Sequence, residues 1–172
     1  MTVLGVIKAH RAVRLFSSQP VPDDVMLAIL DAGHRSQSSK NTQPWQFVVV
    51  TDRSLLETLS KMGDFAGHVA GAAFAVLLVG HHESNWNSFD LGQAAAYLQL
   101  AADELGIGSC IAAMFYPDRV KALLNIPSER SVFCAISFGY PAPEHRPLRM
   151  GGRKPVDDVV FWNMWEGTRA KP

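Results

Sequence analysis

The junction between a polar loop and an apolar run at residues 35–50 constrains the fold more than any other part of the chain. Most side chains of residues 35–43 are polar or charged, whereas residues 46–50 (Gln-Phe-Val-Val-Val) have the composition of a buried strand. Pro44 has a fixed φ at the entrance of this strand and moves Gln43 out of helical geometry. A loop so rich in hydrogen-bond donors suits a polar, planar ligand, and the alternative is a polar turn without a ligand.

The composition fits one folded domain. Of the 172 residues, 48% are hydrophobic and 19% are charged, which supports a sizeable core and excludes a disordered chain. The 16 basic and 16 acidic residues cancel, so no net charge attracts nucleic acid or an anionic membrane. The apolar run at residues 69–80 is too short for a bilayer, and charged residues precede any signal-length apolar stretch. We therefore expect a single domain, residues 1–172, in the cytoplasm.

Apolar periodicity predicts helices and strands along the whole chain. The predicted helices lie near residues 3–9, 22–33, 52–59, 89–105 and 118–125, and the predicted core strands at residues 46–50, 74–79 and 132–138. Asp52 is expected to cap the third helix, and residues 84–88 are expected to form a loop in which Ser88 caps the fourth. The fourth helix has the clearest repeat, and its many alanines allow close approach. It is either a packed central helix or part of a dimer interface.

Motifs for several other chemistries are missing or have the wrong spacing. Residues 81–83 (His-His-Glu) are adjacent, so their side chains diverge in an extended segment, and solvated histidines are expected rather than a metal site. Gly106 and Gly108 follow a helix and lack a third glycine, unlike a dinucleotide-binding loop. Nucleophile motifs are missing as well. Cys110 and Cys134 are expected to be buried thiols in a reducing compartment.

Two basic segments lie near the ends of the chain. His10, Arg11 and Arg14 fall within five residues after the opening helix, where they either clamp a phosphate or simply face solvent. The tail beyond Pro143 is basic and rich in proline, yet residues 156–165 carry several large apolar side chains. Apolar content of this kind predicts that the tail docks, either on its own subunit or across a dimer.

Residues 38–50 resemble a segment of the nitroreductase superfamily, whose members are FMN-dependent oxidoreductases and usually homodimers. The matching residues occur in order and without gaps: Ser38, Ser39, Asn41, Gln43, Pro44, Trp45, Phe47 and Val48 to Val50. The superfamily's Arg-Arg-Ser-x-Arg-x-Phe motif matches Arg11, Arg14 and Phe16, with His10 and Ala12 replacing its first Arg and its Ser. Further resemblance lies in Asp90, Gly92 and Ala94 of the dimer-core helix, in Gly139-Tyr140-Pro141, and in Arg153-Lys154-Pro155 of the arm.

The resemblance implies an α+β fold with a central mixed, mainly antiparallel sheet flanked by helices, and an extended C-terminal arm. It implies a homodimer with FMN sites at the interface, in which the Arg residues hold the phosphate and the backbone of residues 111–114 faces the flavin N5 and O4 edge. The implied cofactor-binding residues are His10, Arg11, Ala12, Arg14, Arg35, Gln37, Ser38, Ser39, Asn41, Gln43, Ile111, Ala112, Ala113, Met114, Arg153 and Lys154. Neither a metal nor a catalytic side chain is expected, because the flavin performs the chemistry.

The activity implied by the resemblance is hydride transfer from NAD(P)H to FMN and then to a nitroaromatic, quinone or enal at the same face, in a ping-pong cycle. The short stretch at residues 62–67 leaves little room for a lid, so we expect an open site. One alternative is a dehalogenase or biosynthetic dehydrogenase on the same scaffold. The other is a flavin-binding carrier or sensor without physiological turnover.

Overall fold

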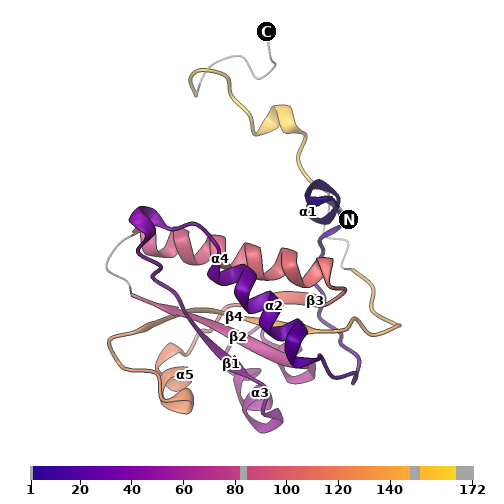
Figure 1. Ribbon diagram of the computed structural model, residues 1–172, viewed down its shortest axis with the longest axis vertical. Coiled ribbons are helices and arrows are strands. Elements are labelled where there is room, and N and C mark those ends of the chain that lie inside the picture. Colours follow the sequence, from indigo (N-terminus) through magenta and orange to yellow (C-terminus); the bar gives the residue numbers. More distant parts are fainter. Residues whose placement is uncertain (1, 82–84, 148–151, 166–172) are drawn as a thin grey trace.

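A four-stranded sheet with helices on both faces forms the body of the molecule (Figure 1). The computed structural model describes residues 2–81, 85–147 and 152–165. Its strands are β1 (Gln46–Val50), β2 (Phe74–Gly80), β3 (Gly108–Ala112) and β4 (Ser131–Gly139). Its helices are α1 (Val3–Ala9), α2 (Asp23–His34), α3 (Arg53–Leu59), α4 (Asn85–Glu104) and α5 (Pro117–Leu124), with 3-10 turns η1 (Ser39–Asn41), η2 (Gly67–Gly71) and η3 (Val156–Asp158).

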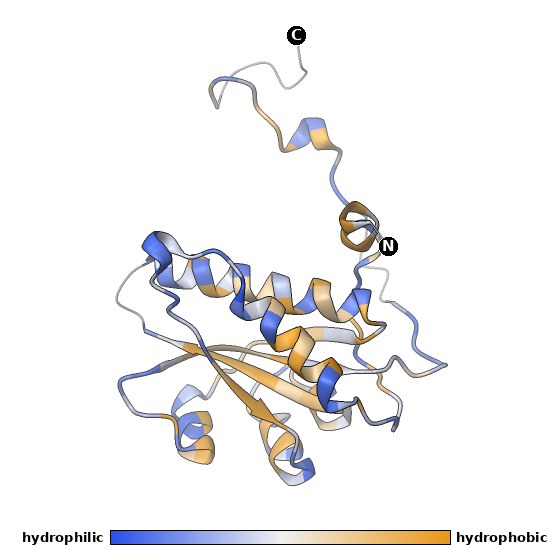
Figure 2. Cartoon of the chain, in the orientation of Figure 1, coloured by the Kyte–Doolittle hydropathy of each residue, from blue (hydrophilic) through white to orange (hydrophobic). Residues whose placement is uncertain are grey.

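The strands follow the order β1-β2-β4-β3, and each neighbouring pair is antiparallel. β2 is buried along its whole length, as its continuous apolar run predicts (Figure 2). Because successive side chains of a strand point to opposite faces, β2 contributes to two separate cores. Phe74, Val76 and Leu78 pack with α2 and α4, while the alternate residues pack with α3, α5 and η2. The sheet is therefore the middle of three layers.

Close packing between α2 and α4 fixes the layer on one face of the sheet. The side chain of Leu98 on α4 occupies the space beside Gly33 on α2, where an added Cβ would lie 2.6 Å from Leu98 Cγ. Beneath these helices, the rings of Phe74 and Phe138 stack with centroids 4.8 Å apart and join β2 to β4. Gly33 therefore does more than end the apolar stripe of α2, because it lets α4 approach.

The predicted α+β fold is confirmed, and the three predicted core strands are present. Asp52 caps α3 as predicted, since its Oδ1 accepts the backbone N–H of Leu55 at 2.9 Å. Hydrogen bonds from the Ser54 hydroxyl and then from the Leu55 backbone lower the pKa of Asp52. The predicted helix after Pro117 ends at Asn125, whose left-handed φ of 52° is a common helix terminator.

The predicted loop at residues 84–88 is wrong for its described part. Residues 85–88 form the first turn of α4, and residue 84 lies outside the described residues. Trp86 and Phe89 pack edge to face with ring centroids 5.8 Å apart, and the Asn87 side chain donates to the carbonyl of His81 at 3.2 Å. These contacts stabilise helix in a stretch whose Ser and Asn residues favour loops on their own.

The strand β3 was not predicted, because Gly108, Ser109 and Cys110 are small and show no alternation of apolar and polar residues. β3 forms by pairing with β4, from Gly108 opposite Gly139 to Ala112 opposite Ala135. The chain after α1 packs closely over it, since a Cβ at Gly108 would lie 2.7 Å from Val13 Cβ. Pairing with a distant strand therefore overrides the weak local preference.

Large apolar side chains remain exposed near both ends of the chain. On α1, Val3, Leu4 and Ile7 face solvent, and a groove of about 570 Å³ runs between α1 and α4. The tail, residues 152–165, leads away from the layers (Figures 1 and 2) and exposes apolar side chains, including Val156 and Trp165. So much apolar surface is unusual for a protein that works as a monomer. None of the described helices is long and apolar enough to cross a membrane.

We predict that Gly33→Ala destabilises the protein by about 1–3 kcal/mol, because the new methyl group overpacks the contact with Leu98. The matched control is Gly67→Ala, where an added Cβ meets no atom within 4 Å. Urea unfolding of both variants at one protein concentration measures the difference. Equal stability of the two variants would show that the α2–α4 contact is not tight.

Candidate active site

The basic segment, residues 10–14, leaves α1 and runs beside the start of β3. The backbone N–H of Val13 donates to the carbonyl of Ser109 at 2.9 Å, which holds the segment against the strand. His10 Nδ1 lies 2.5 Å from Asp103 Oδ2, near the C-terminal end of α4. Asp103 thus occupies one ring nitrogen of His10, so a phosphate contact would have to use Nε2 and stays a prediction.

Arg11 and Arg14 in the basic segment are exposed, and no carboxylate pairs with them among the described residues. Arg11 donates to the backbone carbonyls of Lys8 at 3.0 Å and His10 at 2.7 Å. Burial lowers the pKa of His68, and the positive charge of Arg14 lowers it further. Two guanidinium groups without carboxylate partners suit a phosphate, which accepts paired N–H donors.

The polar loop, residues 35–43, has an unusual backbone. Lys40, Asn41 and Gln43 have φ values of 51°, 57° and 49°. These lie in the left-handed region, which residues other than glycine rarely adopt. The hydroxyl of Ser38 accepts the N–H of Gln43 at 3.0 Å and closes the loop. Backbone strain held in place by specific contacts is frequent at ligand sites.

Asp90 fixes this loop to α4, a role that was not predicted from the sequence. Its Oδ2 accepts the backbone N–H of Ser39 at 3.0 Å, and the residue is only 1% exposed. A buried carboxylate needs hydrogen-bond donors, so an acid within an otherwise apolar stripe signals such a contact. Asp90 stands beside Leu91 and four residues before Ala94, so that signal was present in the sequence.

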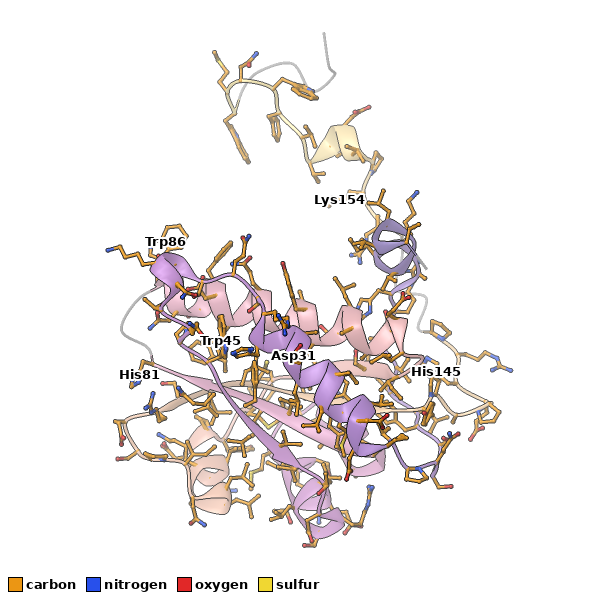
Figure 3. All side chains as sticks on the ribbon, viewed as in Figure 1. Asp31, Trp45, His81, Trp86, His145 and Lys154 are labelled. Carbon is orange, nitrogen blue, oxygen red and sulfur yellow. The ribbon has the colours of Figure 1, made fainter. Side chains whose placement is uncertain are left out.

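Arg35 and Gln37, at the start of the loop, are exposed. Arg35 Nε donates to Asp31 Oδ2 at 2.6 Å across one turn of α2, where Figure 3 labels Asp31. This hydrogen bond lowers the pKa of Asp31 and raises the pKa of Arg35. Arg35 therefore has a partner on its own helix, and its predicted contact with a cofactor stays a prediction.

The end of β3, at residues 111–114, presents both buried and exposed groups. Ala112 and Met114 are buried in the core shared with α3 and α5, whereas Ile111 is 47% exposed and Ala113 is also exposed. β3 is an edge strand, so one side of its backbone is not paired within the sheet. The turn before η2 supports this end, because Met62 accepts the N–H of Phe115 at 2.9 Å.

The loop and the basic segment lie at opposite ends of α4 in one chain. Asp90 holds the loop and Asp103 holds His10, and thirteen residues of α-helix separate the two acids by roughly 20 Å. Arg153 and Lys154 are exposed in the tail, where Figure 3 shows Lys154 far from Trp86 and the loop. The structure of one chain therefore brings the basic segment to β3, but it does not bring either one to the loop.

A buried hydrogen-bonded group near Arg14 resembles a catalytic pair but cannot act as one. His68 Nδ1 lies 2.8 Å from Ser137 Oγ, and that hydroxyl lies 3.3 Å from the carbonyl of Cys110. Ser137 is fully buried, so no substrate reaches its hydroxyl. Burial, opposed by the charge of Arg14, raises the pKa of the Cys110 thiol, which keeps it protonated and unreactive.

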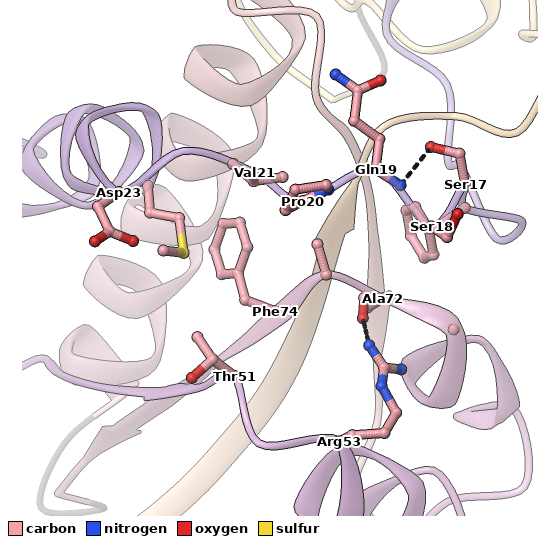
Figure 4. Close-up of a pocket in the computed structure, with 14 residues that line it drawn as sticks. Ser17, Ser18, Gln19, Pro20, Val21, Asp23, Thr51, Arg53, Ala72 and Phe74 are labelled. Atoms are coloured by element: carbon pink, nitrogen blue, oxygen red, sulfur yellow. Dashed lines mark hydrogen bonds between the residues drawn. The ribbon is translucent and has the colours of Figure 1, made fainter.

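A cavity of about 600 Å³ lies between the strand ends and residues 16–23 (Figure 4). None of the residues predicted to bind a cofactor lines it. The guanidinium of Arg53 donates to the carbonyl of Ala72 at 2.6 Å and also to that of Ala70, so this side chain holds the end of η2. We assign this cavity no part in the site.

Comparison with known proteins identifies the family of this chain. The nitroreductase family model matches residues 7–66 and 65–140, which together are well over half of the chain. The chain therefore belongs to the nitroreductase family, as its sequence predicts, and it is an oxidoreductase of that family.

Relatives with similar sequences span nearly the same length. The NADH dehydrogenase of Thermus thermophilus is 28% identical over 89% of this chain and 92% of its own. A protein of Archaeoglobus fulgidus, named as a candidate NADH dehydrogenase or NAD(P)H nitroreductase, is 33% identical over 82% of this chain and 86% of its own. The solved structure of an FMN-dependent nitroreductase from Clostridium difficile R20291 superposes with a TM-score of 0.84, at 29% identity over 94% of this chain and 99% of that one.

His68 makes the stability of the protein depend on pH. Its pKa in the folded state lies below its usual value of about 6.5, so protonation favours the unfolded chain. The stabilising effect is complete above the unfolded pKa, and it is lost as the pH falls towards the folded pKa. We predict that the free energy of unfolding falls between pH 7 and pH 5, and that His68→Gln reduces this fall.

The matched control for this prediction is His34→Gln, because His34 is an exposed histidine at the end of α2. Urea unfolding of wild type and both variants across this pH range gives the comparison. The assignment would be contradicted if His34→Gln changed the pH dependence of the free energy of unfolding and His68→Gln left it as in wild type.

Proposed function

We propose that this protein binds FMN and transfers hydride equivalents from NAD(P)H to a small oxidised molecule. One observation carries the proposal: Arg11 and Arg14, whose guanidinium groups have no carboxylate partner among the described residues, lie on a segment bonded to β3, which is an edge strand of the sheet. The two arginines would donate hydrogen bonds to a phosphate group, and the backbone of β3 would donate hydrogen bonds to the polar edge of a planar ring. The similarity to an FMN-dependent nitroreductase of C. difficile over nearly the whole chain supports the same cofactor.

The phosphate would be held by Arg11 and Arg14, together with Arg153 of the tail. A guanidinium group suits this role because it stays charged and donates two parallel hydrogen bonds to oxygen. Ala12 can offer only its backbone, and His10 only its Nε2, because Asp103 occupies Nδ1. Holding two positive charges in this place costs little desolvation free energy, because both arginine side chains are exposed to water.

The ring would lie along the end of β3, where backbone groups of residues 111–114 would orient its polar edge. When bound, the flavin supplies the hydride and electron chemistry, and no acidic or basic side chain of the chain is needed for it. NAD(P)H gives up two electrons and one proton as a hydride, and a quinone acceptor takes two electrons and two protons, the second proton from water. The exposed Ile111 and Ala113 leave room for donor and acceptor to use one open face in turn.

A second copy of the chain would complete the site with its loop. In a dimer whose twofold axis crosses α4 at a right angle, the two helices run antiparallel, so the loop at one end of α4 would meet the basic segment of the other copy. The outer face of α4 carries Gly92 and Ala96, which are exposed and small enough for close approach. The exposed apolar side chains of α1 and of the tail would also be covered in such a dimer.

The acceptors that fit an open, planar site are nitroaromatics, quinones and related small molecules. The stretch from Lys61 to Gly67 is a short turn with no long insertion over β3. Turnover distinguishes this enzyme from a flavin carrier or sensor on the same scaffold. Steady oxidation of NAD(P)H with several acceptors would support the enzyme, and reduction that stops after one flavin equivalent would support the carrier.

We predict that Arg14→Gln weakens FMN binding by about 1.5–3 kcal/mol, the range for hydrogen bonds to a charged group. Arg153→Ala should have an effect of similar size. The matched control is Arg146→Gln, because Arg146 is an exposed arginine that donates to the carbonyls of Pro143 and His145. Quenching of FMN fluorescence on titration with apoprotein gives each dissociation constant. A value unchanged from wild type would remove that arginine from the site.

We predict ping-pong kinetics, because one flavin face must serve NAD(P)H and acceptor in turn. Double-reciprocal plots at several acceptor concentrations should be parallel. Intersecting lines would indicate a ternary complex and therefore a second binding place for the acceptor.

A further inference from the structure

Trp86 and Phe89 form an exposed aromatic pair on the first turn of α4. Trp86 is 62% exposed and Phe89 is 58% exposed, whereas the next two residues, Asp90 and Leu91, are buried. Their rings meet edge to face, with centroids 5.8 Å apart and an interplanar angle of 81°. This geometry holds the two side chains together and leaves aromatic surface open to solvent.

The pair lies beside the polar loop that the proposed function places at the flavin. Trp86 is four residues before Asp90, so the two side chains lie on the same face of α4, about one turn apart. Asp90 accepts the N–H of Ser39, and η1 contacts α4 directly. Figure 3 shows Trp86 at this end of the helix, pointing away from the sheet.

The antiparallel dimer then gives the pair a place in the site. The loop of one copy would meet the basic segment and β3 of the other, and the pair would arrive there with the loop. Exposed aromatic rings at the border of such a site can bind a second planar ring by stacking. Electron-poor rings, such as nitroarenes and quinones, are favoured partners because the face of an indole ring is electron-rich.

We propose that Trp86, supported by Phe89, is the side chain on which a planar aromatic acceptor stacks in the flavin site of the other copy. The pair is therefore a specificity determinant that favours aromatic over non-aromatic oxidants. This inference rests on the proposed function, because it needs both the flavin and the shared site.

The test isolates the oxidation of the reduced flavin, so that NAD(P)H cannot compete for the same surface. Photoreduced holoenzyme is mixed in a stopped-flow instrument with menadione, a planar quinone, or with ferricyanide, which has no ring to stack. Wild type is compared with Trp86→Leu, Phe89→Leu and Trp86→Phe. Phe65→Leu tests the rival stacking surface, because Phe65 is an even more exposed aromatic, on the turn that supports the end of β3.

We expect Trp86→Leu to raise the dissociation constant for menadione between about twofold and tenfold, the range for one aromatic contact. Phe89→Leu should have a smaller effect, and Trp86→Phe should restore part of the loss. The rate with ferricyanide, the affinity for FMN and the dimer dissociation constant should stay at wild-type values in all three variants.

Three results would overturn the inference: an equal change with both acceptors, no change with menadione, or an effect carried by Phe65→Leu instead. A raised dimer dissociation constant in Trp86→Leu would also overturn it, because the pair would then be covered by the second copy. Failure of the wild-type protein to bind FMN would instead refute the proposed function, and it would be seen before any variant is made.

Discussion

The hydrogen bond from the Ser39 backbone to Asp90 sets the geometry on which the candidate site depends. It fixes a loop with three left-handed residues to one end of α4, while Asp103 fixes His10 to the other end. A helix is a rigid spacer of about 1.5 Å per residue, so these two parts of one chain stay apart. The contact between Leu98 and Gly33 packs α4 against α2, and this prevents the helix from shifting to close the gap.

The rigidity of α4 also explains why so much apolar surface of the single chain is exposed. The small outer residues of α4, the apolar side of α1 and several apolar side chains of the tail are exposed. A twofold axis through α4 would cover these surfaces and join the separated parts of the site in one step. Binding of the cofactor and association of the chains would then stabilise each other, because each would be incomplete alone.

Much of the fold could be predicted from the sequence, because its signals are local. The apolar run of β2, the cap at Asp52 and the junction of the polar loop with β1 each depend on a few neighbouring residues. β3 could not be predicted, because its small residues form a strand only by pairing with β4, more than twenty residues away. The first turn of α4 was also missed, because the contact between Trp86 and Phe89 outweighs the preferences of Asn and Ser.

The candidate site shows the same division between local and distant information. Its candidate residues come from short motifs that resemble the nitroreductase family; the comparisons confirm the family, and the role of each residue stays a prediction. Their separation along α4 could not, since it depends on how Asp90 and Asp103 each bind a segment far away in sequence. Asp90, an acid within an apolar stripe, was the one local sign of this arrangement. Its position predicts a hydrogen-bond partner, but it does not predict which residue that partner is.

Subunit complementation tests the shared site most directly. One variant carries Arg11→Gln and Arg14→Gln in the basic segment, and the other carries Ser39→Ala and Asn41→Gly in the loop. Glycine keeps the left-handed backbone at position 41 while removing the amide side chain. Each variant alone should bind FMN weakly. When the two are unfolded together and refolded, the account predicts that about a quarter of all sites recover wild-type affinity, because half of the twofold dimers are mixed and each has one intact site. Recovery of no sites would show that each chain builds its site alone and would contradict the account.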